Sequence, residues 1–298
     1  MNGGDFMSHK FIYHNTVKLG DADWVLVGVP NEEGNFSNRQ GTSEGPKAIR
    51  KASRERLSFI RQGERHCIVP ERETFVTRLC DYGDINKKEI VTFMNKLGKG
   101  QRVILLGGDH SNTFLALKGL EQKYKEVAVI YLDAHPDMIG SFRPYYGSVV
   151  YDILKLSHVN SKKVVEVGIR SIEQEERTQL KTKKIKAYTA IEVYERGIQQ
   201  IFKEIKRKIG KTPLYLSIDL DVIDPAFAPG VDTPASFGLF PQEFLWFVKQ
   251  CAGLNLISFD VMEMSPRYDI QQRTAQLAAQ TIVEIIASAI KKKSSHKI

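Results

Sequence analysis

The stretch VAVIYLDAHPD at residues 127–137 gives the clearest indication of both the fold and a functional site. It begins with a near-continuous apolar run, which is typical of a strand covered on both faces. The run ends at Leu132, and Asp133, His135 and Asp137 follow at alternate positions. In extended backbone, alternate residues point to the same side. Three ligand-type side chains therefore converge at the carboxyl end of a buried strand, where open α/β sheets place their sites.

Two other predicted strands end in a similar way. GGDHS at 107–111 follows the apolar run 103–106, and SIDLD at 217–221 follows the run 214–216. Buried together, the acids of the three strand ends carry more negative charge than a protein can hold without cations. The candidate metal ligands are His110, Asp133, His135, Asp137, Asp219 and Asp221.

Mixed carboxylate and imidazole ligands suit a hard or borderline divalent ion, and manganese is the natural candidate. Some of these side chains can bridge, so the set is large enough for two Mn²⁺ ions about 3.5–4 Å apart that share a water. The alternative is a structural salt-bridge cluster. The alternate spacing recurs at two strand ends, which favours a metal site.

Strand and helix patterns alternate along the chain and predict an α/β fold with three layers, in which a mostly parallel central sheet lies between two helical layers. No linker or repeat divides the sequence, so we expect one domain over residues 1–298, with 1–20 and 291–298 peripheral or frayed. Residues 58–78 are charged and aperiodic, and we expect a loop with a possible short helix there. The predicted strands are 24–29, 102–106, 127–132, 164–169, 185–188, 213–218 and 254–260, and the predicted helices are 46–57, 87–97, 111–123, 149–156, 173–179, 191–208, 241–251 and 273–290.

Composition excludes several classes of protein. The formal net charge is +8, but the last eight residues alone carry four lysines and no acid, which leaves about +4 on the rest. The remaining lysines lie at helical spacing and predict solvated faces, so we expect no nucleic-acid partner. There is no run of 18 apolar residues and no signal-peptide pattern at the start, so we expect no membrane span. Three scattered cysteines without CxxC spacing indicate reduced thiols in a cytoplasmic protein.

An ordered set of motifs resembles the ureohydrolase family of arginase, agmatinase, guanidinobutyrase and formimidoylglutamase. The matching segments are GGDHS at 107–111, DAHPD at 133–137, SIDLDVIDP at 217–225 and FDVMEMSP at 259–266. GTSEGPKAIRKAS at 41–53 and DYGDI at 81–85 also look like family segments. The resemblance covers roughly residues 24–290 and implies an arginase-like fold, a linear guanidino substrate and the release of urea.

The resemblance also implies roles for individual residues. His110, Asp133, Asp137 and Asp219 would bind the first ion, and Asp133, His135, Asp219 and Asp221 the second, with Asp133 and Asp219 bridging. Glu263, after the predicted strand that ends in FDV, matches the glutamate that grips the substrate's guanidinium. Asp137 matches the carboxylate that bonds the attacking hydroxide and protonates the departing amine. Family members are commonly trimers or hexamers, so we expect a homo-oligomer.

The loop after Asp137 departs from the family pattern. Arginases and agmatinases carry a histidine there, whereas this chain has Tyr146, and no histidine lies between His135 and His158. We assign Tyr146 and Arg143 to substrate binding. Arg143, together with Arg267 after Glu263, predicts a substrate with an acidic tail in preference to agmatine.

Other classes stay open on the sequence alone. One is agmatinase or arginase proper, and another is a non-catalytic member of the same family. A dinuclear phosphoesterase uses similar residues but has a Gly-Asn-His segment, which is absent here. The related deacetylase chemistry uses one zinc and fewer acids.

Overall fold

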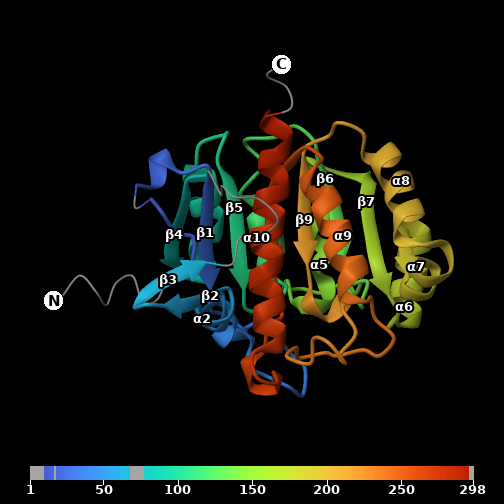
Figure 1. The fold of residues 1–298 in the computed structure, drawn as a ribbon. Helices are drawn as coiled ribbons and strands as arrows, with labels where there is room; N and C mark the ends of the chain where they lie inside the picture. Colours follow the sequence, from blue (N-terminus) through green and yellow to red (C-terminus); the bar gives the residue numbers. More distant parts are fainter. Residues whose placement is uncertain (1–9, 17, 68–76, 295–298) are drawn as a thin grey trace.

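Eight strands form one central sheet in the computed structural model, which describes residues 10–16, 18–67 and 77–294 (Figure 1). The strand order is β4-β1-β5-β10-β9-β6-β7-β8, and all seven neighbouring pairs are parallel. Parallel pairing brings every carboxyl end to the same edge, which is the lower edge in Figure 1. The strands are β1 (Trp24–Val29), β4 (Leu79–Asp84), β5 (Arg102–Gly107), β6 (Val127–Leu132), β7 (Val159–Ile169), β8 (Lys186–Thr189), β9 (Leu214–Ile218) and β10 (Leu256–Val261).

Two helical layers cover the sheet, because alternate strand residues project into two separate cores. On β1, Trp24 and Leu26 pack in one core, while Val25 and Val27 pack in the other. The first core is closed by α2 (Gly45–Arg56), α7 (Ala190–Arg196), α8 (Ile198–Ile209), α9 (Pro241–Ala252) and α10 (Arg273–Ser294). The second is closed by α3 (Ile90–Lys96), α4 (Asn112–Lys118), α5 (Val149–Ile153) and α6 (Gln174–Lys183). The predicted three-layer α/β/α fold is confirmed.

The expectation of a loop or short helix at 58–67 is wrong. This stretch forms an antiparallel hairpin of β2 (Ser58–Arg61) and β3 (Glu64–Cys67). Gln62 and Gly63 join the strands with φ of 54° and 82°, and two positive φ angles characterise a tight hairpin turn. The charged, mostly exposed strands have no clean alternation of apolar residues, so the usual strand signal is missing. Residues 68–76 of the predicted loop lie outside the described residues.

Two further differences have local causes. The single helix predicted over 191–208 is two helices, because Gly197 adopts a φ of 79° between α7 and α8. The edge strand β4 was not predicted, since its last four residues are the polar run Asp81-Tyr82-Gly83-Asp84.

Arg50 explains why this polar strand is stable at the sheet edge. Its guanidinium reaches from α2 and donates to Asp81 at 2.9 and 3.0 Å and to Asp84 at 2.6 Å. Asp81 is buried and also accepts the Phe11 N–H at 2.8 Å. Removing one partner of such a buried pair costs about 3–5 kcal/mol. The family-like segments 41–53 and 81–85 are therefore joined through one arginine.

Short 3-10 turns occupy several loops: η1 (Leu19–Asp21), η2 (Thr42–Glu44), η3 (Lys87–Glu89), η4 (Tyr146–Ser148), η5 (Leu220–Val222) and η6 (Pro266–Tyr268). Three of these turns, η4, η5 and η6, follow the carboxyl ends of β6, β9 and β10 and frame the candidate site. In the part of the chain that is described, none of the helices has the length and apolar character needed to cross a membrane.

Candidate metal centre

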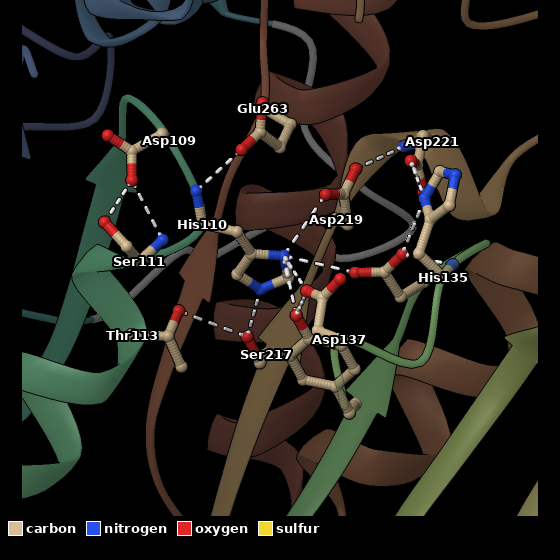
Figure 2. A network of polar contacts seen from close by, with 12 residues as sticks. Asp109, His110, Ser111, Thr113, His135, Asp137, Ser217, Asp219, Asp221 and Glu263 are labelled. Atoms are coloured by element: carbon tan, nitrogen blue, oxygen red, sulfur yellow. Dashed lines mark hydrogen bonds and ion pairs between the residues drawn. The ribbon is translucent and has the colours of Figure 1, made fainter. Parts of the chain in front are cut away.

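The candidate ligands meet because their strands are neighbours. The order β5-β10-β9-β6 places four carboxyl ends side by side at the centre of the sheet. His110 follows β5, Asp133 follows β6, and Asp219 follows β9. Glu263 follows β10, which lies between β5 and β9. Residues up to 153 positions apart in the sequence therefore share one small volume (Figure 2).

Two groups of ligand atoms form around a shared aspartate. His110 Nδ1 lies 3.2 Å from Asp133 Oδ2 and 3.2 Å from Asp219 Oδ2. His135 Nδ1 lies 3.4 Å from the other oxygen of Asp133 and 2.9 Å from Asp221 Oδ2. Within each group the ligand atoms all lie within 4.8 Å of one another. Asp133 belongs to both groups, as a bridging carboxylate would, whereas Asp219 belongs only to the first.

Asp137 lies at the margin of the first group. Its Oδ2 is 4.0 Å from His110 Nδ1 and accepts a hydrogen bond from the Tyr131 hydroxyl. Asp137 has a φ of 50°, a value that a residue other than glycine adopts only when its surroundings impose it. The sequence predicted alternation in extended backbone, but the chain turns at Asp137 and brings its carboxylate back over the cluster (Figure 2).

The charges of the cluster fit divalent cations. Burial, followed by the negative charge of neighbouring aspartates, raises the pKa of Asp137 and Asp219 well above the usual range. Burial opposes charge on the imidazoles, yet the adjacent carboxylates raise the pKa of His110 to about 9 and that of His135 to about 12. Each buried carboxylate thus requires a positive charge beside it. A bound cation would supply that charge and leave the imidazoles neutral, which is the form that binds metals.

A layer of hydrogen bonds fixes the orientation of His110. Its Nε2 lies 2.8 Å from Ser217 Oγ, and the Ser217 hydroxyl donates to Asp260 Oδ1 at 2.8 Å. Asp260 also accepts from the hydroxyls of Thr113 and Tyr215 at 2.8 and 2.7 Å. Such partners set the tautomer of a metal-binding histidine and hold the ring in place. Ser217 was not predicted as part of the site, although it lies two residues before Asp219 and so faces the same side of β9.

Glu263 is presented beside the cluster by another strained turn. Its φ is 64°, and its Oε1 accepts the backbone N–H of His110 at 2.7 Å. Burial is the main reason that the pKa of Glu263 is raised well above the usual range, and Asp219 adds to the effect. A buried carboxylate in this state is suited to receive a cationic group from a ligand.

The predicted substrate residues lie in different surroundings. Tyr146 is half-buried, and its pKa is raised by burial and then by the charges of Glu263 and Asp137. Arg143 is exposed, and its backbone N–H donates to Ser141 Oγ at 3.4 Å. Arg267 is also exposed, and its Nη2 lies 3.7 Å from Glu44 Oε1.

Fold and site together define an α/β protein with two groups of metal-ligand side chains at the carboxyl ends of its strands. A profile of the Arginase family matches residues 22–287. The chain belongs to the arginase family, whose members bind a dinuclear metal site, and it is a hydrolase that acts on C–N bonds of linear amidines. The family predicted from the ordered motifs is confirmed.

Several known proteins are similar over nearly the whole chain. An agmatinase of Neisseria meningitidis serogroup C is 30% identical over 282 residues, which cover 89% of this chain and 86% of the relative. A hypothetical agmatinase from Burkholderia thailandensis has a TM-score of 0.84 at 30% identity, covering 96% of this chain and 92% of that one. Proclavaminate amidino hydrolase from Streptomyces clavuligerus also has a TM-score of 0.84 at 30% identity, covering 95% and 97%.

Proposed function

We propose that the chain hydrolyses a linear guanidino compound and releases urea, with two Mn²⁺ ions bound per subunit. The observation that carries the proposal is the position of Asp133, whose two oxygens face two separate ligand groups, with Glu263 bound to the His110 backbone beside them. We assign the predicted ligands His110, Asp133, His135, Asp137, Asp219 and Asp221 to the two ions, and mixed carboxylate and imidazole ligands support manganese. The whole chain would form one ureohydrolase domain.

The proposed roles of the side chains follow from their placement. When bound, divalent ions would lower the pKa of water at the site and so would supply hydroxide near neutral pH. Glu263 holds the guanidinium by charge-assisted hydrogen bonds and turns its planar carbon toward the cluster. Asp137 holds the proton that the departing amine needs. Tyr146 contacts the substrate as a hydrogen-bonding group, because with its raised pKa it stays protonated at neutral pH.

The state of the cysteines agrees with the expected cytoplasmic location. Cys67, Cys80 and Cys251 are all free. Free thiols are the usual state in a reducing compartment. This supports the proposal of a cytoplasmic protein.

The first prediction concerns metal removal. Chelation is expected to abolish urea release and to lower the melting temperature, because it leaves buried carboxylates without counter-ions. Manganese should restore both. Asp133→Asn should retain fewer than two ions per subunit by elemental analysis, while the exposed control Asp21→Asn should retain two. Full metal content and activity in Asp133→Asn would refute the assignment.

The second prediction concerns Glu263. Glu263→Gln keeps the shape of the side chain but removes the charge that orients the guanidinium. We expect kcat/KM to fall by about 10²–10³-fold, the cost of losing an oriented charged contact in the transition state. Elemental analysis should still find two ions. Glu126→Gln, before β6 at the opposite edge of the sheet, is the control. Urea release near the wild-type rate would place guanidinium recognition elsewhere.

Two opposing sets of charges bear on the substrate's tail. The acidic tail remains a prediction that rests on Arg143 and Arg267, both of which are exposed. The antiparallel bridge between Val231 and Met264 places the backbone of the buried Asp232 beside that of Glu263. A buried carboxylate favours an amine-bearing tail, so an agmatine-like compound is the second candidate.

A panel of guanidino compounds tests both the proposed reaction and the preferred tail of the substrate. The manganese-loaded protein is assayed with agmatine, 4-guanidinobutyrate, arginine and the tailless methylguanidine, and urea, ammonia and phosphate are measured. We expect urea alone, with the acid-tailed compound favoured by at least tenfold in kcat/KM. If agmatine is preferred over every acid-tailed compound, the acidic tail is excluded, and Asp232→Asn should then remove the preference. No urea from any of them would refute the proposed function.

The proposed partner is a second copy of the chain. Arg170 donates to the carbonyls of Ala235 at 2.8 Å and Ser236 at 3.1 Å, and this holds the next residue, Phe237, in a strained conformation with a φ of 65° and 87% exposed. Phe237 lines two adjoining grooves of about 440 and 540 Å³, whose other walls include the exposed Ile191. An aromatic projection and apolar grooves on one surface are self-complementary, which suits contact between identical subunits.

Light scattering on the purified chain tests this partner. The wild type is expected to be a trimer or a hexamer. Phe237→Asp should dissociate it, because a charge would be buried in the contact, whereas Ile60→Asp on the β2–β3 hairpin should not. A monomeric wild type, or an unchanged mass for Phe237→Asp, would contradict the proposal.

A further inference from the structure

Asp109 belongs to the same loop as His110, but its carboxylate points away from the imidazole ring and toward Ser111 (Figure 2). It is fully buried and accepts hydrogen bonds on both oxygens. One oxygen accepts the N–H of Ser111 at 3.0 Å and the Ser111 hydroxyl. The other accepts the N–H of Gly34 at 3.0 Å and the Asn31 side-chain amide at 3.0 Å. Asp109 therefore binds the segment 31–34 to the loop that carries His110.

Gly34 extends this connection to the predicted substrate residue. Its carbonyl accepts the backbone N–H of Tyr146 at 3.1 Å. Nearby, the rings of Phe36 and Tyr145 lie 5.8 Å apart. Two hydrogen bonds in series thus join the Asp109 carboxylate to the backbone of Tyr146, across three segments that are distant in the sequence.

The close approach at Gly34 depends on the absence of a side chain. A Cβ at this position would lie 2.6 Å from Ser111 Oγ and 2.7 Å from Asp109 Oδ1, which is shorter than real Cβ contacts. The φ of Gly34 is not positive, so alanine is acceptable to its backbone. Alanine would therefore displace either the segment or the Ser111 and Asp109 side chains by steric contact, which disturbs this approach and leaves the charge of Asp109 unchanged.

We propose that Asp109 is a positioning residue that acts through Gly34 to place Tyr146 against the substrate, and that it does not serve the metal site. The inference rests on the proposed function only in assigning Tyr146 to substrate binding. His110 is held independently of Asp109, by Ser217 at its Nε2 and by Glu263 at its backbone N–H. Loosening the Asp109–Gly34 bond should therefore weaken substrate binding and leave the metal ligands in place.

The test uses Gly34→Ala and Asp109→Asn, with Gly20→Ala as the matched control, because a Cβ at Gly20 meets no atom within 4 Å. In the manganese-loaded enzyme, KM is expected to rise about tenfold in both test variants, with kcat within threefold of wild type and two ions retained. In a Tyr146→Phe background the same changes should raise KM by less than threefold, since they act through Tyr146. Amide hydrogen exchange at Tyr146 should accelerate in Gly34→Ala and not in Gly20→Ala.

Several outcomes would overturn the inference. One is unchanged exchange at Tyr146 in Gly34→Ala. Others are an undiminished rise in KM in the Tyr146→Phe background and loss of metal in both test variants. If Asp109→Asn does not fold, Gly34→Ala decides the question alone. If the wild type releases no urea, the proposed function fails, whereas the exchange measurement still decides whether Asp109 and Gly34 hold Tyr146.

Discussion

Removing carboxylates from water is costly, and this cost governs how the site and the strand ends around it are built. Asp133, Asp137, Asp219 and Asp221 are each at most 4% exposed and lie together at one edge of the sheet. Buried carboxylates packed this closely together stay charged only when cations lie beside them. The raised pKa values of His110 and His135 show how strongly this corner attracts positive charge. Two divalent ions satisfy that demand, which is why the cluster indicates a metal site and not a structural ion pair.

The sheet brings the side chains of the site together, and strained backbone at two of these residues sets the orientation of their side chains. Neighbouring parallel strands deliver His110, Asp133 and Asp219 to one edge without any special backbone. Asp137 and Glu263 are different, since both have positive φ angles that ordinary residues avoid. Strain of this kind persists only where surrounding bonds impose it, here the Tyr131 hydroxyl on Asp137 and the His110 N–H with Glu263. The residues assigned to proton transfer and guanidinium binding are therefore held in position before any substrate arrives.

Much of the fold and of the cluster could be predicted, because the apolar runs and residue spacings that indicate them lie within short segments of the sequence. The buried strand over 127–132 was predicted with its observed bounds, and two of the three residues that alternate after it, Asp133 and His135, belong to the candidate ligand groups. The edge strand β4 was missed because Arg50, 31 residues away from Asp81, supplies its stability. The break at Gly197 was missed because a glycine inside a helical pattern does not by itself show a positive φ. Ser217 and Asp109 were missed because their roles depend on contacts between segments, which no periodicity reveals.

The proposed metal ligands and the proposed substrate contacts are held by different parts of the fold, so substrate specificity can change separately from metal binding. The proposed metal ligands lie on strand ends that the two cores hold rigidly, so they tolerate little change. The proposed substrate contacts lie on loops that hydrogen bonds between distant segments connect, such as those from Asp109 to Gly34 and from Gly34 to Tyr146. Substitutions in those loops can change the tail that is accepted without disturbing the strand ends. Tyr146 in such a loop, beside the predicted set of ligands, is the pattern that such a separation allows.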